Sequence, residues 1–245
     1  MIKFNRAFLD SGKLYPHLNN YFAVGTWPDK LAITIHPNKE PDNAFHPSSA
    51  SECLRVLNYK MRGLFQPAVT GDMRKSFMYG HYVHALIEWI IVEGLKFSTW
   101  DDIEKEYNIT IDTHAGNSMK IRGFTDIARC NIPGHGTYLV DIKTMTSRTF
   151  SQNGLPEYLR HKYESQVQIY MFLEGIDRSI ILIVEKDSPH RFKEVYVQRD
   201  NDRILSIIDG WKHVADSIVE GFIPECTCVD PNKCPILDAI QTAET

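Results

Sequence analysis

Two short runs in the middle of the chain carry side chains suited to metal-dependent hydrolysis. The first is Gly123-Phe-Thr-Asp126, and the second, which begins fifteen residues after that aspartate, is Asp141-Ile-Lys143. Two converging carboxylates would bind a hard divalent cation through oxygen ligands, and the backbone carbonyl of Ile142 would add another. Such an ion lowers the pKa of a bound water and neutralises charge on a phosphate. Lys143 would orient or deprotonate that water, or stabilise transition-state charge, so the chemistry indicated is phosphodiester hydrolysis.

A predicted β-hairpin over residues 119–143 would position these groups. Two stretches of β-forming residues flank the turn signal Asn131-Ile-Pro-Gly-His-Gly136. Side chains two apart on a strand share a face, so Asp141 and Lys143 lie together, and the neighbouring strand brings Asp126 alongside. Asp-x-Lys is by itself a weak signal, because about one chance occurrence is expected in a chain of this length.

Two predicted helices add further polar groups. Residues 76–94 form an amphipathic pattern in which His84 and Glu88, four residues apart, share one face. His84 would be a metal ligand, and the alternative is an ordinary structural histidine. Downstream, Gln166 and Tyr170 lie one helical turn apart on an otherwise apolar helix. Taken singly, each of these residues has a simple packing explanation.

In order and spacing, the runs Gly80 to His84, Gly123 to Asp126, Asp141 to Lys143 and Gln166 to Tyr170 resemble the RecB-like branch of the PD-(D/E)XK nuclease superfamily. The family pattern is G-x-x-x-H, G-x-x-D, D-x-K and Q-x-x-x-Y, and the resemblance covers roughly residues 49–235. It implies Mg²⁺ or Mn²⁺ ligation by His84, Asp126, Asp141 and the Ile142 carbonyl. It also implies catalysis by Lys143, and a site-supporting, DNA-contacting role for Gln166 and Tyr170.

The cysteines extend this resemblance. Cys53, Cys226, Cys228 and Cys234 are similar to the four ligands of a [4Fe-4S] cluster in relatives of AddB and of the CRISPR-associated exonucleases. The family spaces the first two C-terminal cysteines C-x-x-C, whereas one residue separates Cys226 from Cys228. Tetrahedral Zn²⁺ on the same thiolates is the nearest alternative, and a disulfide is disfavoured in an intracellular protein. Cys130 is interpreted as a small buried hydrophobe.

Composition indicates a globular α/β protein. The chain has 245 residues, 43% of them hydrophobic, which is enough for one good core. The N-terminus lacks the apolar run of a signal peptide and no segment is long enough to span a bilayer, so we expect a cytoplasmic protein without membrane contacts. Residues 1–48 look like an irregular arm, and residues 49–245 form the nuclease-like domain.

The expected architecture is a restriction-endonuclease-like core, with a central mixed sheet flanked by helices and the two ends tied by the metal cluster. Besides the hairpin, the capping box Ser49-Ala-Ser-Glu52 predicts a helix over residues 49–62. The remaining patterns predict helices over 76–94, 156–174 and 201–220 and strands over 179–185 and 192–197.

The function expected from the resemblance is a metal-dependent exonuclease acting on single-stranded DNA ends, with replication or recombination proteins as partners. Because histidine is a softer ligand than carboxylate, activity with Mn²⁺ should at least equal that with Mg²⁺. The net charge of −4 argues against a nucleic-acid binder, although basic residues cluster locally. A non-catalytic DNA-binding scaffold and a site-specific endonuclease, which requires base-edge readout, are the alternatives.

Overall fold

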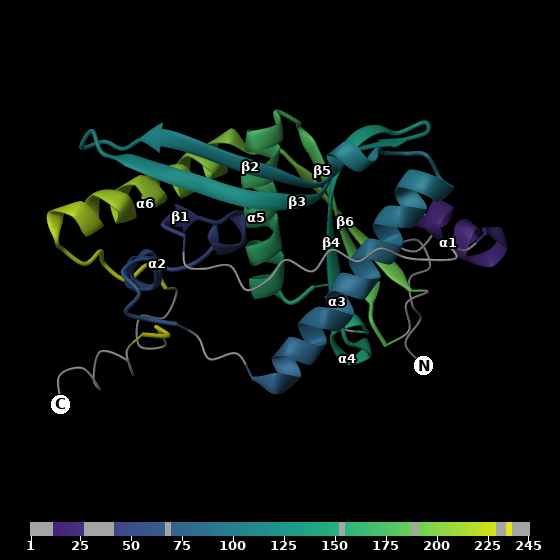
Figure 1. Ribbon diagram of the computed structural model, residues 1–245, viewed down its shortest axis with the longest axis horizontal. Helices are drawn as coiled ribbons and strands as arrows, with labels where there is room; N and C mark the ends of the chain where they lie inside the picture. The colour runs from purple at the N-terminus through teal and green to yellow at the C-terminus, as the bar shows by residue number, and fades with distance from the viewer. Residues whose placement is uncertain are drawn as a thin grey trace.

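A mixed six-stranded β-sheet organises the protein, and helices pack against both of its faces (Figure 1). The computed structural model describes residues 12–26, 42–66, 70–151, 155–187, 191–228 and 234–236. The strands are β1 (Ala44–Phe45), β2 (Ile103–Asp112), β3 (Ser118–Ile132), β4 (Gly136–Met145), β5 (Arg178–Glu185) and β6 (Phe192–Gln198). β3 pairs with β1 in parallel, β4 pairs with β5 in parallel, and the other pairings are antiparallel. The predicted α/β class with a central mixed sheet is confirmed.

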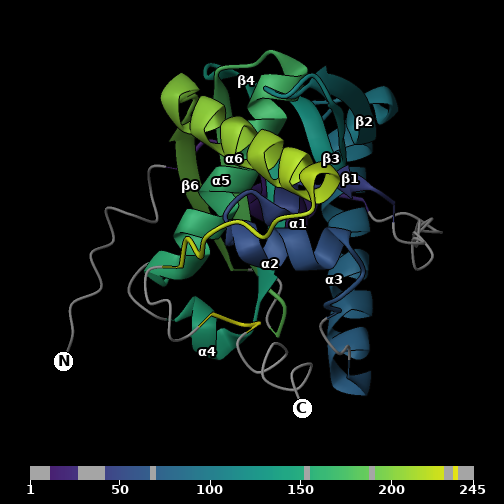
Figure 2. The ribbon, with the colours of Figure 1, turned by 90° about the vertical axis from the view of Figure 1, so that its left-hand side faces the viewer.

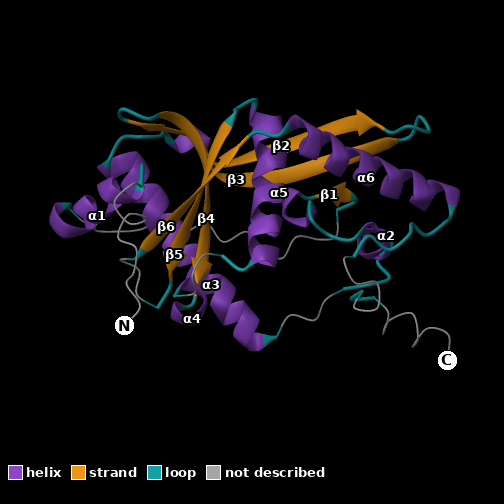
Figure 3. Ribbon diagram, turned by 180° about the vertical axis from the view of Figure 1, so that it is seen from behind, coloured by secondary structure: helices purple, strands orange, loops and turns teal. Residues whose placement is uncertain are grey.

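Strand β3 changes partner along its length. It pairs with β2 from Ser118 to Ile127 and with β4 from Ile127 to Ile132, and the register with β4 shifts between Ile127 and Cys130. Seen from behind, β2 and β3 run together to one side while β4, β5 and β6 run in another direction (Figure 3). The side chain of Asp126 therefore sits where one pair of strands gives way to the other.

Six helices and three shorter helical segments complete the described architecture. The helices are α1 (Tyr15–Val24), α2 (Leu54–Met61), α3 (Gly71–Trp89), α4 (Ser147–Phe150), α5 (Glu157–Glu174) and α6 (Asn201–Glu220). The shorter segments are the 3₁₀ turns Pro47–Ser49 and Trp100–Asp102 and the π-helical segment Ile90–Gly94. Helices α5 and α6 both end at a glycine in the left-handed conformation, with φ of 69° at Gly175 and 82° at Gly221.

The two faces of the sheet bury separate clusters. On one face, Leu18 of α1 and Ile87 of α3 pack in a cluster with Ile142 of β4. On the other face, Val167 of α5 packs in a cluster with Leu139 of β4. Because Leu139 and Ile142 are three residues apart on one strand, they point to opposite faces, and both strand faces are covered.

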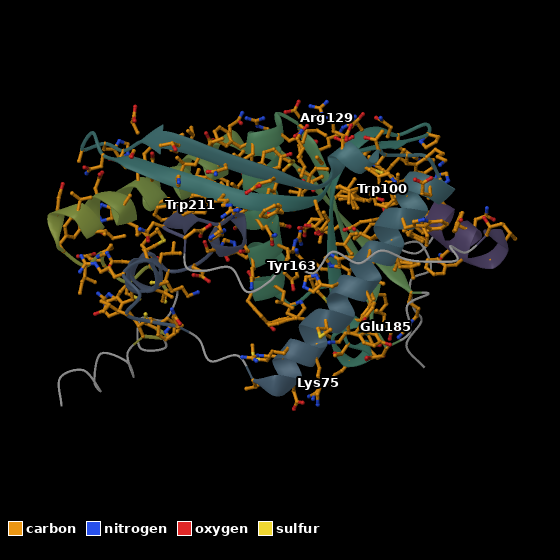
Figure 4. The ribbon with its side chains drawn as sticks, viewed as in Figure 1. Lys75, Trp100, Arg129, Tyr163, Glu185 and Trp211 are labelled. Atoms are coloured by element: carbon orange, nitrogen blue, oxygen red, sulfur yellow. The ribbon has the colours of Figure 1, made fainter. Side chains whose placement is uncertain are left out.

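A third cluster joins α2, α6 and the β1–β3 edge of the sheet. Phe45 of β1 stacks on Trp211 of α6 with ring centroids 5.4 Å apart, and Trp211 (Figure 4) is the largest fully buried side chain among the described residues. Viewed from the side, α6 crosses the molecule above α2 (Figure 2). A buried hydrogen bond from Asn58 Nδ2 to Ser217 Oγ, 2.8 Å long, links those two helices.

The predicted elements are confirmed for the most part, and the start of α2 is a correction. The hairpin over 119–143, the two strands and the helices 156–174 and 201–220 all lie within two residues of their predicted ends. The prediction that a capping box starts this helix at residue 49 was wrong, because α2 begins at Leu54, with Cys53 as its N-cap. Ser49 lies in a 3₁₀ turn, where its hydroxyl donates to the His46 carbonyl.

Helix α3 differs from the sequence expectation, and helix α1, helix α4, strand β1 and strand β2 were not predicted. Helix α3 begins at Gly71 rather than 76, since the Thr70 hydroxyl accepts a hydrogen bond from the Met73 amide. Helix α1 lies within the arm expected to be irregular. Strand β2 was missed, although Tyr107, Ile109 and Ile111 alternate with polar residues along it.

Within the part of the chain that the structure describes, no helix combines the length and the apolar character needed to cross a bilayer.

Helix α1 is part of the core, and this can be tested. Leu18 is fully buried in the cluster with α3 and β4, whereas Val24 on the same helix is 76% exposed. We expect Leu18→Ala to lower the free energy of unfolding by about 2–5 kcal/mol, because it leaves a cavity. Val24→Ala, measured alongside by denaturant unfolding, should change it by less than about 0.5 kcal/mol. Equal stability of the two variants would show that α1 does not belong to the folded unit.

Candidate functional site

Asp126 lies at the centre of the candidate site, between two other acidic residues in strand order. Ile103 of β2 pairs with Ile127 of β3, and Lys105 pairs with Thr125. The residues between these two pairs, Glu104 and Asp126, therefore lie opposite each other. On the other side of β3, Ile127 pairs with Val140 of the antiparallel strand β4. Asp126 and Asp141 are the next residues along the two strands from this pair. Three adjacent strands therefore bring Glu104, Asp126 and Asp141 to neighbouring positions.

The carboxylate of Asp126 contacts two different elements. Its Oδ1 atom lies 3.3 Å from Nδ1 of His84 on α3, and its Oδ2 atom accepts a hydrogen bond from the backbone amide of Ile142 on β4. Burial alone would raise the pKa of Asp126, but His84 and Lys143 hold it below its ordinary value. Burial acts to lower the pKa of His84, and the adjacent Asp126 raises it. The two side chains are therefore in direct contact at the strand junction, and each shifts the pKa of the other.

Asp141 and Lys143 form a second buried pair on β4. Lys143 Nζ lies 2.9 Å from Asp141 Oδ1 and 2.8 Å from Oδ2, and Asp141 is 2% exposed. Burial raises the pKa of Asp141 to about 6, with Lys143 opposing the rise and Asp126 adding to it. Burial would lower the pKa of Lys143, but Asp141 and Asp126 raise it, so the ammonium stays charged.

The aromatic ring of Tyr163 closes this pair from the side of α5. Its centroid lies 5.4 Å from Lys143 Nζ, and it projects from α5 near the middle of the molecule (Figure 4). A ring face at this distance attracts a cation and excludes water from it. Lys143 is therefore held in one place between Asp141 and Tyr163.

Two further acidic residues join His84 and Asp126. One ligand atom from each of His84, Glu88, Glu104 and Asp126 lies within 4.8 Å of the others. Burial raises the pKa of Glu88 to about 8, with Asp126 and Glu104 adding to the rise and His84 opposing it. The sequence placed Glu88 on the face of His84 but did not single out Glu104, because β2 was not predicted.

Gln166 and Tyr170 lie behind β3 and are buried, 8% and 4% exposed. Burial and the carboxylates of Asp141 and Asp126 raise the pKa of Tyr170, and hydrogen bonds with Gln166 and the backbone of Phe124 partly offset the rise. These contacts attach α5 to the segment of β3 that leads into Asp126, and so support the site from the rear.

The structure thus brings together His84, Asp126, Asp141 and Lys143, with Gln166 and Tyr170 packed behind them. The backbone amide of Ile142, rather than its carbonyl, makes the contact with Asp126. Assignment of the Ile142 carbonyl as a ligand stays a prediction. The donor set, mostly carboxylate oxygens with one imidazole nitrogen, fits Mg²⁺ or Mn²⁺.

The four cysteines expected to act together form a second site at the other end of the molecule. One sulfur from each of Cys53, Cys226, Cys228 and Cys234 lies within 4.8 Å of the others, and Cys53 Sγ is 3.7 Å from Cys226 Sγ. All five cysteines of the chain are free thiols, so the disulfide alternative is not observed. Cys130 is fully buried in the main core, as predicted.

Cys53 stands at the N-terminus of α2, which favours its thiolate form. Burial acts to raise its pKa, but the backbone amides of Val56, Thr227 and Arg55 and the Thr227 hydroxyl lower it to about 6. The Leu54 amide also donates to Thr227 Oγ1, and Arg55 Nε donates to the Pro224 carbonyl. The C-terminal segment is therefore attached to the start of α2 by hydrogen bonds as well as by the shared thiol site.

Comparisons with known proteins give similarity only at the level of solved structures. No protein-family model matches this sequence, and no curated protein matches it. The chain is similar to the crystal structure of SSO0001, at 19% identity and a TM-score of 0.48 over 75% of this chain and 78% of that one. It is also similar to an alkaline exonuclease from Laribacter hongkongensis, at 14% identity and a TM-score of 0.45 over 73% of this chain and 89% of that one. A putative exonuclease from Eubacterium rectale matches at 14% identity and a TM-score of 0.46 over 87% of this chain and all of that one.

The glycine of Gly123-Phe-Thr-Asp126 permits the close approach of β3 to its surroundings, which predicts a stability difference. A Cβ atom at Gly123 would lie 2.8 Å from Pro47 Cδ and 3.1 Å from Tyr170 Cε1, whereas one at Gly80 would meet only Thr144 Oγ1, at 3.4 Å. We expect Gly123→Ala to lower the free energy of unfolding by about 1–3 kcal/mol through overpacking.

Gly80→Ala is the matched control, because Gly80 lies within helix α3. It should leave stability unchanged or raise it by up to about 1 kcal/mol through helix propensity. Denaturant unfolding of both variants measures the difference. A Gly123→Ala protein as stable as the wild type would contradict the close packing of β3 against Pro47 and Tyr170.

Proposed function

We propose that this protein is a metal-dependent nuclease that hydrolyses phosphodiester bonds, acting as an exonuclease on single-stranded DNA ends. The observation that supports the proposal most directly is the position of Asp126 between His84 on one side and β4, with the Asp141–Lys143 pair, on the other. The ordered motifs that resemble the RecB-like nucleases fall at this one place.

The residues have separate tasks in the proposed reaction. His84, Asp126 and Asp141 would hold a divalent cation, which supplies an activated water and neutralises charge on the phosphate. Lys143 lies on the same face of β4 as Asp141 and would stabilise the negative charge that develops on the phosphate oxygens. Hydrolysis forms a bond from the water oxygen to phosphorus and breaks the bond from phosphorus to the leaving sugar oxygen.

The preference for single strands is proposed from the exposed half of α3. Phe77 is seven residues before His84, so the two share a helix face, and Phe77 is 53% exposed. Tyr79 and Tyr82 on the same helix are 58% and 49% exposed. Lys75 lies at the outer end of this helix (Figure 4). Exposed aromatic rings with basic neighbours suit unpaired bases, which stack on the rings while the cations contact phosphates.

The basic residues Lys60 and Arg62, at the end of α2, are less suited to binding DNA, because both make contacts within the protein. Lys60 pairs with Glu52 at 2.7 Å. Arg62 donates to the carbonyls of Ser217 and Phe222, at 3.2 and 3.1 Å. We therefore propose the α3 side of the molecule, rather than the α2 side, as the path of the substrate.

The cysteine site is proposed to bind a structural metal centre. The resemblance favours a [4Fe-4S] cluster. A sulfur separation of 3.7 Å also fits a single tetrahedral Zn²⁺, whose bonds of about 2.3 Å place neighbouring sulfurs about 3.8 Å apart. A cluster of four irons would require the thiolates to lie farther apart. In either case the centre would hold the C-terminal segment against α2.

Cleavage of an end-labelled linear single-stranded DNA with Mn²⁺ tests the catalytic proposal. Lys143→Ala and Asp141→Asn should each reduce EDTA-sensitive cleavage by at least about 100-fold, because each removes a group that acts on the reacting phosphate or its ion. Lys120→Ala is the control, since Lys120 is an exposed lysine at the other end of the sheet.

Thermal melting of each variant separates loss of chemistry from loss of folding. A circular single strand should survive if the protein is an exonuclease, whereas cleavage of the circle would indicate an endonuclease. A well-folded wild type that leaves every substrate intact would favour the DNA-binding scaffold, and full activity of Lys143→Ala would contradict the mechanism.

Metal analysis of protein purified without oxygen tests the cysteine site. We expect either about four irons with about four sulfides per chain, or one zinc, depending on which centre the thiolates hold. Cys234→Ser should lose most of this metal and unfold at a lower temperature, because metal binding contributes to folding. Cys130→Ala should keep the metal, since Cys130 lies in the main core. A wild-type protein that contains no metal and is no more stable than Cys234→Ser would contradict the proposal.

A further inference from the structure

A group of basic residues lies where the ends of β5 and β6 meet helix α4. Residues 145–151 and 185–193 contain four lysines and arginines but only two carboxylates, whereas the whole chain has a net charge of −4. One of the two carboxylates, Glu185, is fully buried (Figure 4). This part of the molecule therefore has a positive excess that the chain as a whole lacks. The four residues, which we call the basic corner, are Arg148, Lys186, Arg191 and Lys193.

The register of the sheet places the basic corner on the same face as Lys143. Lys143 of β4 pairs with Ile183 of β5, and Ile183 pairs with Lys193 of β6. Neighbouring strands lie about 4.8 Å apart, so the backbone of Lys193 is about 10 Å from that of Lys143. A stacked single strand, at about 3.4 Å per nucleotide, covers this span in about three nucleotides. A strand cleaved beside Lys143 can therefore reach the basic corner.

Helix α4 and a buried carboxylate hold two of these cations in place. Arg191 Cζ lies 5.1 Å and Lys193 Nζ lies 4.5 Å from the ring centroid of Phe150, and Lys193 also donates to the Phe150 carbonyl. Arg191 pairs with Glu185, yet 47% of the Arg191 side chain is exposed. A cation that is fixed by the protein and still open to solvent loses little freedom when it binds an anion.

Arg191 and Lys193 are close enough to influence each other. Burial lowers the pKa of Lys193, and the charge of Arg191 lowers it further, while Glu185 opposes the change. The potential at this position is therefore positive even for a lysine. A bound anion would relieve the repulsion between the two cations, and a phosphate offers oxygens to both a guanidinium and an ammonium group.

The basic corner is joined to the exposed half of α3. Lys186 Nζ donates a hydrogen bond of 2.7 Å to Ser76 Oγ, on the residue before Phe77. The Ser147 amide at the start of α4 donates to Asp187 Oδ2, also at 2.7 Å. The segment after β5 thus contacts both helices, which lie at the same end of the molecule (Figure 2). The substrate path proposed along α3 therefore continues onto α4.

We propose that the basic corner binds the sugar-phosphate backbone of the single-stranded substrate, next to the place where the strand is cleaved. The inference rests on the proposed nuclease function and deepens it, because it names a surface that holds the strand outside the reaction centre. Contacts with phosphates carry no sequence information, so strands of any sequence should bind equally well here. The local charge also explains how a chain with a net charge of −4 binds a polyanion.

Binding of a labelled single strand in EDTA, measured over a range of KCl concentrations, tests this surface without cleavage. Each lost phosphate contact reduces the slope of log Kd against log [KCl] by about 0.7 for a single strand. The triple variant Arg148→Gln, Lys186→Gln, Lys193→Gln should therefore lose about 2 from this slope and bind about 10-fold more weakly at low salt. Glutamine keeps a donor for the Ser76 and Phe150 contacts. Arg191 is left unchanged, because its removal would take a cation from the buried Glu185.

The matched control is a second triple variant with the same change in charge, Lys96→Gln, Lys120→Gln, Lys212→Gln. Its residues lie outside α4 and the ends of β5 and β6, and Lys212 belongs to α6 at the opposite end of the molecule from α4 (Figure 2). This control should keep at least most of the wild-type slope. An equal loss of slope in both triple variants would show a general effect of charge and would overturn the proposal.

Thermal melting identifies any variant that fails to fold. If the triple variant of the basic corner melts lower than the wild type, Arg148→Gln alone decides the case, because Arg148 is an exposed residue of α4. That single substitution should reduce the slope by about 0.7. A folded Arg148→Gln protein with the wild-type slope would then refute the surface.

The outcomes separate this inference from the proposed function. If the wild type cleaves DNA and the triple variant binds the strand with an unchanged slope, the basic corner is refuted and the nuclease proposal stands. If the slope falls as expected but the wild type cleaves no substrate, the surface stands and the nuclease proposal fails. A wild type that does not bind the strand at all would refute the surface.

Discussion

The structure depends on keeping several carboxylates together where water is largely excluded. Asp141 and Glu88 are almost fully buried and the side chain of Asp126 is 14% exposed, so their mutual repulsion is poorly screened. The chain itself supplies one nearby cation, Lys143, and the imidazole of His84, which lies 3.3 Å from Asp126. Each is fixed by a different helix or strand, so the arrangement requires α3 and β4 to be docked on β3. The negative charge that Lys143 leaves uncompensated would favour binding of a divalent cation at the proposed site.

The parts of this site that were predictable follow from regular backbone geometry. A period of two residues places Asp141 and Lys143 on one strand face, and a spacing of four places Glu88 on the helix face of His84. The hairpin that carries Asp126, Asp141 and Lys143 could be predicted because a strong turn signal separates two β-rich runs. In each case the chemistry needed only local geometry and one short-range pairing, which a single sequence encodes well.

The parts that were not predictable depend on tertiary contacts or on irregular backbone. Glu104 reaches the site through a backbone with a positive φ within a strand. A glutamate in the sequence gives no sign of this conformation. At the start of α2 the capping box competed with Pro47, which begins a 3₁₀ turn, and with the pairing of Glu52 to Lys60. The grouping of Cys53 with three cysteines over 170 residues away came only from family resemblance, because no local rule brings such distant thiols together.

The exchange of partners along β3 has a consequence for how the site is kept in register. One continuous strand carries the ladder with β2, then Asp126, then the ladder with β4. The two halves of the sheet are therefore joined by covalent bonds at Asp126, which lies between Glu104 and Asp141 in strand order. A shear between the halves would have to stretch or unpair β3 itself, so the strand resists any change in the separation of Glu104 and Asp141.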